Sequence, residues 1–310
     1  MLLTYFKPFI QPTQRQIKSQ WKWLWGHILT TILGGLKYLP AKKAITLFAK
    51  IAMTLGPLTH RHKIALENLY AAYPEKSKAE IKMIASEMWG NMGRLVAEYV
   101  FLDKIFDFDP HQKQNGLIEV SGIELFEKIK NDKKPIIFFT AHTGNFELLP
   151  ICAAKLNVNI TALFRPPNNP YIAKRVLQTR SMTMGLIPSQ AGAALALTEK
   201  LKMGGNIGVL VDQKFTSGIP GTFFKRPVKT NPLLAKLART FNCDVYPTRC
   251  IRLPEGRYRL EIYPPMKFAR TQNGSIDVPL STQQLNDLVE TWVREYPSQW
   301  MWFHKRWTHS

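Results

Sequence analysis

The sequence contains little of what marks the specialised classes of protein. Its 310 residues include only 3 Cys and 18 Gly, so neither a disulfide scaffold nor a collagen-like chain fits. Cys152, Cys243 and Cys250 form no C-x-x-C pair, and an odd number of thiols cannot all pair within one chain. This usage favours a reducing compartment. Hydrophobic residues make up 45% of the chain, which excludes disorder for most of it.

Acidic residues are scarce as well. The chain has 22 Asp and Glu against 42 Lys and Arg, which gives a formal charge of +20. Such an excess favours an acidic partner: nucleic acid, an anionic membrane face or an acidic protein. Many aromatic residues lie in the basic, apolar ends of the chain, as is typical of a membrane interface. No helix-turn-helix, RNA-binding or zinc-finger pattern occurs, and we expect no nucleic-acid partner.

Long hydrophobic runs are missing near the N-terminus. The 14 residues between Lys22 and Lys37 contain no Lys, Arg, Asp or Glu, but a helix needs about 20 apolar residues to span a bilayer. A second apolar stretch follows Lys42 and Lys43 and is interrupted by Lys50. Two helices with basic edges are typical of an interfacial anchor on anionic lipid. The alternative is a helical hairpin that caps a soluble core.

The two ends of the chain carry further expectations. Lys7, Arg15 and Lys18 precede the first apolar run and no A-x-A-like site follows it, so the pattern is not that of a cleaved signal peptide. The C-terminal segment 300–307, WMWFHKRW, mixes aromatic and basic residues, and we expect it to strengthen contact with a bilayer. We divide the chain into a membrane-associating helical segment, residues 1–60, and a second domain, residues 61–310.

The pattern of apolar residues changes along the chain. Residues 61–107 have helical spacing, with a capping box formed by Ser77 and Glu80. Beyond them short apolar runs alternate with helical patterns, which predicts an α/β fold with a central, mostly parallel or mixed sheet flanked by helices. Strands are expected at 117–120, 135–141, 158–164, 206–212, 245–252 and 257–263, and helices at 122–130, 146–156, 171–183, 190–202, 231–241 and 282–296. The glycines at 204–205 and 218–221 lack phosphate-loop spacing and are interpreted as turns.

The segment 135–150, PIIFFTAHTGNFELLP, holds the residues that suggest chemistry. A largely apolar strand leads to His142, and Glu147 follows across a turn that Gly144 permits. In open α/β sheets ligands bind at such strand ends. The spacing predicts that Glu147 folds back onto the imidazole and fixes its tautomer, so that His142 acts as a general base. Asn145 is expected to cap the following helix.

Less specific interpretations of the histidines stay open. A histidine at a strand end with a glutamate nearby also occurs by chance. Metal binding fits less well, because H-x-x-x-x-E lacks the His pair of zinc hydrolases and no Cys lies close. His60 and His62 lie two residues apart in a basic stretch and fit a solvated face better than a metal site. We therefore expect no metal and no cofactor.

Several segments together resemble a known family. HTGNFE at 142–147 resembles the H-x-x-x-x-[DE] motif of glycerolipid-type acyltransferases, in the form found in the bacterial lipid A late acyltransferases. FRPPNNP at 164–170, VDQ at 211–213 and PSQWMWFHKRW at 297–307 are similar to that family's other motifs in order and spacing. The resemblance spans roughly residues 22–307. Lys225 departs from it, since many members have Gly after the Phe pair.

The resemblance implies an acyltransferase and suggests roles for single residues. His142 and Glu147 are then catalytic, and Arg180 matches the family's second essential arginine. A guanidinium stays charged and suits the oxyanion of a tetrahedral intermediate. Arg165 lies at a loop mouth where a phosphate fits. The substrate-binding residues are expected to be Arg165, Asn145 and Asp212.

The same resemblance implies the partners and the location. The donor is then acyl carrier protein, the acceptor is a lipid A precursor, and the enzyme works on an anionic membrane surface, at the cytoplasmic face of a bacterial inner membrane, in lipopolysaccharide biosynthesis. One alternative is an acyltransferase for another membrane glycolipid or a glycerophospholipid. The other is a non-catalytic basic protein that binds anionic lipid, which would tolerate loss of the His142 imidazole.

Overall fold

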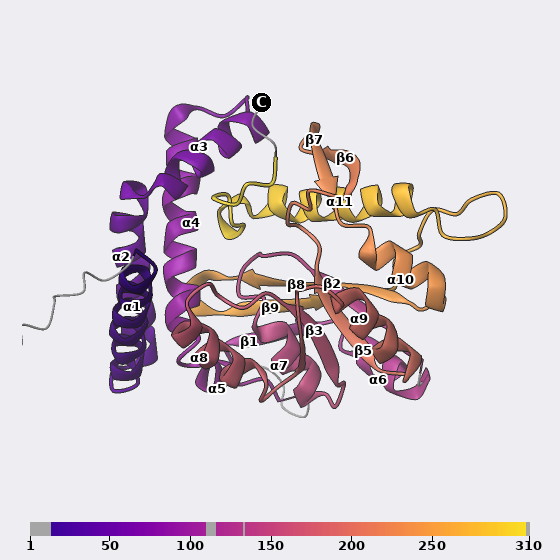
Figure 1. Ribbon diagram of the computed structural model, residues 1–310, viewed down its shortest axis with the longest axis horizontal. Coiled ribbons are helices and arrows are strands. Elements are labelled where there is room, and N and C mark those ends of the chain that lie inside the picture. The colour runs from indigo at the N-terminus through magenta and orange to yellow at the C-terminus, as the bar shows by residue number, and fades with distance from the viewer. Residues whose placement is uncertain (1–13, 110–115, 133, 308–310) are drawn as a thin grey trace, which may run out of the picture.

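The computed structural model describes residues 14–109, 116–132 and 134–307, so Lys7 lies outside the described residues. The helices are α1 (Gln14–Leu36), α2 (Ala41–Leu55), α3 (His60–Ala72), α4 (Lys78–Glu98), α5 (Leu102–Ile105), α6 (Glu124–Asp132), α7 (Leu148–Lys155), α8 (Pro170–Arg180), α9 (Ala193–Lys202), α10 (Leu233–Phe241) and α11 (Val278–Glu295). The strands are β1 (Ile118–Ser121), β2 (Ile137–Thr140), β3 (Ile160–Phe164), β4 (Gly185–Pro188), β5 (Asn206–Leu210), β6 (Ile219–Phe223), β7 (Arg226–Thr230), β8 (Val245–Arg252) and β9 (Tyr258–Ile262). Figure 1 shows their arrangement.

A seven-stranded sheet forms the centre of the fold, which confirms the expected α/β class. Its strand order is β1-β9-β8-β2-β5-β3-β4. All neighbouring pairs are parallel except β8 with β9, so the sheet is mixed. Strands β8, β2, β5, β3 and β4 therefore end at the same edge, where parallel sheets bind ligands.

Two hydrophobic clusters cover the two faces of the sheet. Alternate residues of β2 divide between them: Ile137 and Phe139 pack on one side, Phe138 on the other. Helices α9, α10 and α11 contribute to the first cluster, and α6 and α7 to the second. Strand β8 is buried on both sides, as expected for a central strand. A strand buried on both faces appears in the sequence as a short, nearly continuous apolar run.

Local signals set several helix boundaries. The predicted capping box is present, because Ser77 N donates to Glu80 Oε2 at 2.8 Å and Glu80 N donates to Ser77 Oγ at 3.3 Å. The side chain of Asn169 caps α8 by accepting from Tyr171 N at 3.0 Å. Its amide also donates to Lys22 O at 2.7 Å and thereby docks α1 against α8. These caps fix where the helices begin.

The N-terminal helices α1 and α2 lie at one end of the molecule (Figure 1). Both helices match the two apolar stretches of the sequence. No helix in the described part of the chain is both long and apolar enough to cross a bilayer. Helix α2 packs closely on α4, since a Cβ at Gly93 would lie 2.2 Å from Phe48 O. The division of the chain at residue 60 stays a prediction.

Two expectations about the sheet are corrected. The short edge strand β4 lies between two predicted helices, and residues 219–221 of the segment 218–221, interpreted as a turn, belong to strand β6. Strands β6 and β7 form a separate antiparallel hairpin. Pro220 is tolerated there because a two-stranded ribbon leaves one edge of each strand without a partner. The hairpin loop consists of Phe224 and Lys225, both at positive φ, 53° and 55°.

The C-terminal aromatic cluster is part of the core, which corrects the expectation that it contacts a bilayer. Trp300, Trp302 and Trp307 are at most 2% exposed. The indole rings pack on one another and on Phe223. Composition alone misled here, because amphipathic aromatics suit a wet interface and a buried site with hydrogen-bond acceptors equally well.

The strained hairpin loop gives a test of the fold. Two positive φ values define a type I′ turn, which favours glycine at its second position. We expect Lys225→Gly to stabilise the protein by up to about 1 kcal/mol, because a residue with a Cβ pays that much in the left-handed region. Thermal unfolding measures the effect. The control Lys229→Gly, in strand β7 of the same hairpin, should lower the unfolding temperature. A decrease for both variants would contradict the assigned loop conformation.

Candidate active site

The register of two neighbouring strands brings His142 and Asp212 together. Strands β2 and β5 are parallel, with Thr140 opposite Leu210. Two residues further on, the chain reaches His142 on one strand and Asp212 on the other. His142 Nδ1 lies 2.8 Å from Asp212 Oδ1. The backbone N–H of His142 donates to Asp212 Oδ2 at 3.0 Å. The pair therefore stands at the carboxyl edge of the sheet.

Asp212 is a buried carboxylate held by several donors. It is 4% exposed, and besides the two contacts with His142 it accepts the indole N–H of Trp300 at 2.8 Å. Burial alone would raise its pKa, but the charge of protonated His142 and these hydrogen bonds hold the pKa of the carboxyl well below its usual range. Asp212 therefore stays ionised and keeps the proton of neutral His142 on Nδ1. It was expected to bind substrate; instead it positions the imidazole.

Glu147 is not the partner of His142, which corrects the predicted pairing. Its carboxylate accepts from Arg180 Nε at 2.9 Å and from Arg180 Nη2. Arg180 Nη2 also donates to the hydroxyl of Tyr99 at 3.0 Å. Although burial alone lowers it, the pKa of Arg180 is raised by Glu147 and Tyr99. Glu147 directly precedes helix α7 and faces Arg180, the last residue of α8.

Asn145 belongs to a buried network and has no exposed surface. Its amide donates to Glu98 Oε2 at 2.8 Å, and its Oδ1 accepts from Glu147 N at 3.2 Å. Glu98 also accepts from both terminal nitrogens of Arg252 and from the hydroxyl of Tyr258. The predicted roles of helix cap and substrate contact are thus corrected. Asn145 joins the turn after His142 to helix α4 and strand β8.

The C-terminal segment holds the turn in place. Gly144 N donates to Gln299 O at 3.1 Å. The side chain of Gln299 makes two hydrogen bonds with the backbone of Arg252: its Oε1 accepts from Arg252 N, and its Nε2 donates to Arg252 O. Gly144 has φ +58°, and a Cβ there would lie 2.1 Å from Cys250 O. Glycine is therefore required on two grounds. The turn, β8 and the segment after α11 are locked together.

The other ring nitrogen of His142 is available for chemistry. Gln213 Nε2 lies 3.3 Å from His142 Nε2, and the ring of Phe146 meets the imidazole edge-on with centroids 5.1 Å apart. The amide of Gln213 is thus within hydrogen-bond range of Nε2. With the proton on Nδ1, Nε2 carries the lone pair, which is what a general base needs.

Arg306 braces Gln213 from behind. It is 1% exposed, and its Nη1 donates to Gln213 O at 3.3 Å and to Lys229 O at 3.0 Å. Burial lowers the pKa of Arg306 to about 10. Arg165, predicted to lie at a loop mouth, does follow strand β3 at the same edge of the sheet and is exposed. No contact joins it to His142 in the described residues.

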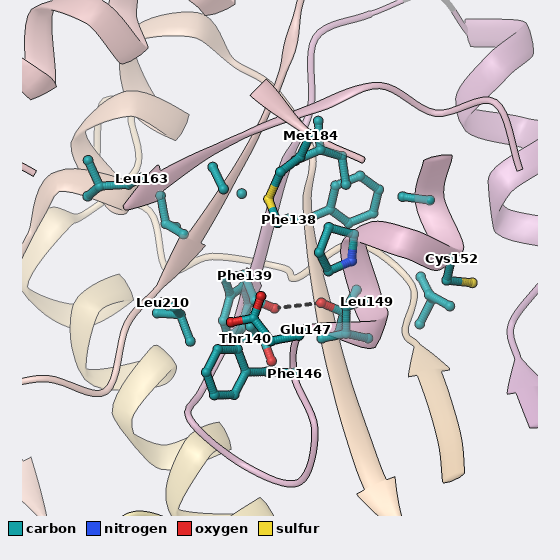
Figure 2. A pocket seen from close by; sticks show the side chains of 18 of the residues that line it. Phe138, Phe139, Thr140, Phe146, Glu147, Leu149, Cys152, Leu163, Met184 and Leu210 are labelled. Carbon is teal, nitrogen blue, oxygen red and sulfur yellow. Dashed lines mark hydrogen bonds between the residues drawn. The ribbon is translucent and has the colours of Figure 1, made fainter. Parts of the chain in front are cut away.

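Two cavities meet at the pair formed by Glu147 and Arg180. The smaller, of about 90 Å³, lies against the sheet, and Figure 2 shows Leu163 and Leu210 on one side of it and Cys152 on the other. The larger, of about 540 Å³, lies among α1, α4, α5, α7 and α8. Both are lined by Glu147, Arg180 and Met184. The smaller is almost wholly apolar and reaches Thr140 and Phe146, beside His142.

The Phe pair lines neither of these two cavities. Phe223 and Phe224 are buried in the core against the C-terminal tryptophans. No cluster of three or more His, Cys, Asp or Glu side chains in the described ranges is arranged to hold a metal ion. The site thus offers a histidine base, an acidic residue that orients it, a buried arginine and an adjoining apolar cavity. This set suits deprotonation of a hydroxyl and transfer to it of a group with a long apolar chain.

Comparison with known proteins gives the class. The family model for bacterial lipid A biosynthesis acyltransferases matches residues 11–309. The chain belongs to this family and is an acyltransferase of lipid A biosynthesis, which confirms the resemblance of its motifs. The alternative of a non-catalytic lipid-binding protein is set aside.

Individual relatives are distant but match over most of their length. The chain is 22% identical over 305 residues to lipid A biosynthesis acyltransferase 2 of Shigella flexneri, covering 97% of this chain and 95% of the relative. It is 22% identical to lipid A biosynthesis acyltransferase of Haemophilus influenzae, covering 92% and 87%. Lipid A biosynthesis myristoyltransferase of Escherichia coli is also 22% identical, with 91% and 86% covered.

Several site residues were missed by the sequence analysis. No role was predicted for Trp300, Gln299, Gln213 or Glu98, although the first three lie in motifs that carry the family resemblance. The pairing of His142 with Asp212 had a signal, since both residues directly follow predicted strands that the α/β pattern makes parallel. Neighbouring parallel strands end side by side, so the two residues were candidates for contact.

The hydrogen bond from Trp300 to Asp212 can be tested directly. We expect Trp300→Phe to lower kcat about tenfold or more, because a hydrogen bond to a charged group contributes about 1.5–3 kcal/mol and its loss lets the pKa of Asp212 rise. Steady-state kinetics measures this. The matched control Trp307→Phe removes an indole that donates to Phe223 O at 3.0 Å. It should destabilise the fold similarly and leave kcat within about twofold. If both variants lost kcat equally, Trp300 would contribute through packing and not through its hydrogen bond to Asp212.

Proposed function

We propose that the protein transfers a fatty acyl group from acyl carrier protein to a hydroxyl of a lipid A precursor, at the cytoplasmic face of a bacterial inner membrane. One observation carries this proposal: the buried carboxylate of Asp212 holds Nδ1 of His142, and Phe146, whose ring meets the imidazole, lines an apolar cavity. A base of this kind activates a hydroxyl at neutral pH. Membership of the lipid A acyltransferase family supplies the acceptor class.

The reaction proceeds in one transfer without an acyl-enzyme. His142 Nε2 takes the proton of the acceptor hydroxyl, on an acyl chain already attached to the acceptor, as the hydroxyl oxygen attacks the carbonyl carbon of the donor thioester. The tetrahedral intermediate collapses when the carbon–sulfur bond breaks. The imidazolium returns the proton to the leaving thiolate. Asp212 stabilises the imidazolium between these steps because its charge lies 2.8 Å from Nδ1.

Arg180 and Glu147 act at the second polar position of the site. The guanidinium uses Nε and Nη2 on Glu147 and Tyr99, and no hydrogen bond engages its Nη1 among the described residues. Its plane stacks on Phe164, 4.7 Å from the ring centroid. We assign Nη1 to the oxyanion, with Glu147 fixing the orientation of the guanidinium. Arg165, exposed at the same sheet edge, is assigned to a phosphate of the acceptor.

The donor chain enters the smaller cavity. Its lining includes Leu163, Met184 and Leu210, and burial of an alkyl chain contributes about 0.8 kcal/mol per CH₂. A cavity of about 90 Å³ must widen to take a long chain, and the flexible side chain of Met184 is suited to move. The net charge of +20 favours an acidic carrier protein as the molecule that delivers the donor acyl chain.

The N-terminal helices form the surface that meets the membrane. Exposed apolar side chains on both include Trp21, Trp25, Ile32, Leu47 and Ile51. Exposed Lys22, Lys42, Lys43 and Lys50 lie among them. An apolar face edged with lysines binds anionic lipid, each lysine contributing about 1 kcal/mol near the surface. Because the C-terminal tryptophans are buried, membrane contact is assigned to α1 and α2 alone.

The function is tested by the products it leaves in cells. Mass spectra of lipid A from cells with and without the protein should differ by the mass of the added acyl group, since each acylation has a defined mass. Restoration by the wild-type protein and not by His142→Ala completes the test. An unchanged lipid A spectrum combined with altered glycerophospholipids would assign the enzyme to the alternative acceptor.

The orienting role of Asp212 makes a quantitative prediction. We expect Asp212→Asn to lower kcat by about 10³–10⁴, because the amide donates to Nδ1 and places the imidazole proton on Nε2, the wrong tautomer for a base. Turnover of purified enzyme with acyl-carrier donor and lipid A precursor measures this. The control Asp277→Asn changes the cap of α11, where Asn serves as well as Asp, and should keep full turnover. Near-normal kcat for Asp212→Asn would refute the mechanism.

The membrane surface is tested by flotation with anionic liposomes. We expect Trp25→Gln combined with Ile32→Gln to lower the floating fraction several-fold, because both changes remove apolar area that enters the bilayer. The control pair Met83→Gln and Leu280→Gln, at residues equally exposed on α4 and α11, should have no effect. High salt should release the first variant more than wild type, since the lysines then act alone and are screened. If both double variants floated equally, α1 and α2 would be a helical hairpin that caps the core and not a membrane-binding surface.

A further inference from the structure

The larger cavity is not used by the mechanism above. Its volume of about 540 Å³ lies within the roughly 300–1,000 Å³ of ligand sites. The walls are mainly apolar and include Leu33, Val100, Phe106, Ile151 and Val176. Such a cavity is built to take a hydrocarbon chain, because each buried CH₂ contributes about 0.8 kcal/mol.

Cations stand at the rim of this cavity. Lys37, Lys155 and Arg175 line it and are exposed, and no ion pair joins them to a carboxylate within the described part of the chain. The carboxylates of the lining are Asp103 and Glu147, and Glu147 is neutralised by Arg180. Three cations therefore face one free carboxylate. The complement is a ligand with both an alkyl chain and phosphate groups.

The position of the cavity links it to both the membrane and the reacting atoms. Leu29, Leu33 and Lys37 of α1 line it, while Trp25 and Ile32 of the same helix face outward. A lipid that leaves the bilayer beside α1 thus meets the cavity first. At its inner end the cavity shares Glu147, Arg180 and Met184 with the smaller one.

We propose that this larger cavity binds the acyl chain of the acceptor that carries the attacking hydroxyl, with a second phosphate of the acceptor, distinct from the one assigned to Arg165, at Lys37, Lys155 and Arg175. The inference rests on the proposed function. Donor and acceptor chains then approach the pair of Glu147 and Arg180 from opposite sides. Transfer of an acyl group from one chain to a hydroxyl on another requires such convergence, because the reacting atoms must come within about 3–3.5 Å.

The test measures binding without turnover. Full-length protein carrying His142→Ala is titrated with purified lipid A precursor in detergent micelles, with no donor present. Val176→Trp fills the cavity, and Leu177→Trp, on the exposed neighbour, is its control. Arg175→Glu reverses a rim charge, and Lys174→Glu reverses one outside the lining. We expect the first variant of each pair to raise the Kd about tenfold or more and each control to change it less than twofold.

Other outcomes overturn the inference in distinguishable ways. If all four variants bound the acceptor tightly, the acceptor would not bind in this cavity, and the proposed function would still hold. Weaker binding of the acyl-carrier donor, with acceptor binding unchanged, would assign the cavity to the donor chain. Equal loss of phosphatidylglycerol micelle binding would make it a general phospholipid site. Failure of the parent protein to bind the lipid A precursor would overturn both this inference and the proposed acceptor.

Discussion

The buried charge of Asp212 is the constraint on which the rest of the site depends. A carboxylate removed from water costs several kcal/mol unless donors surround it. Here the donors come from the end of β2, which supplies His142, and from the C-terminal segment, which supplies Trp300. Three parts of the chain, separated by up to 158 residues, must therefore meet for the fold to bury this charge. In the proposed mechanism the same contact that stabilises the fold also orients the base, so stability and catalysis are coupled at Asp212.

Two further buried ion pairs lie near the turn. Glu98 pairs with Arg252, and Glu147 pairs with Arg180, each with a tyrosine hydroxyl completing the set. Removing one partner of a buried pair leaves an uncompensated charge, which costs about 3–5 kcal/mol. The two networks join through Asn145 and the backbone of Glu147. The turn after His142 is held in place because Asn145 bonds to Glu98 of α4 and Glu147 bonds to Arg180 of α8.

The pair of Glu147 and Arg180 lies where two cavities of different character meet. The apolar cavity against the sheet and the cation-rimmed cavity under α1 touch only at the pair of Glu147 and Arg180 together with Met184. An acyltransferase of lipid A biosynthesis handles two amphipathic substrates. The fold provides one apolar space inside the α/β sheet and one between the sheet domain and the N-terminal helices. Three exposed cations, Lys37, Lys155 and Arg175, line the second of these.

The sequence by itself determined the α/β class, the expected positions of six of the sheet strands, the capping box at Ser77 and the position of His142 at a strand end. These features depend on local periodicity, caps and motifs, which are set by residues close together in the chain. Only the tertiary structure decided that Asp212, and not Glu147, holds the imidazole, that Asn145 is enclosed, and that the C-terminal tryptophans face inward. Local spacing places Glu147 near His142 in the chain, but the pairing of β2 with β5 and the ion pair of Glu147 with Arg180 settle which carboxylate reaches the ring. Partners of buried charges are chosen by which elements pack together, and that choice is made by the whole fold.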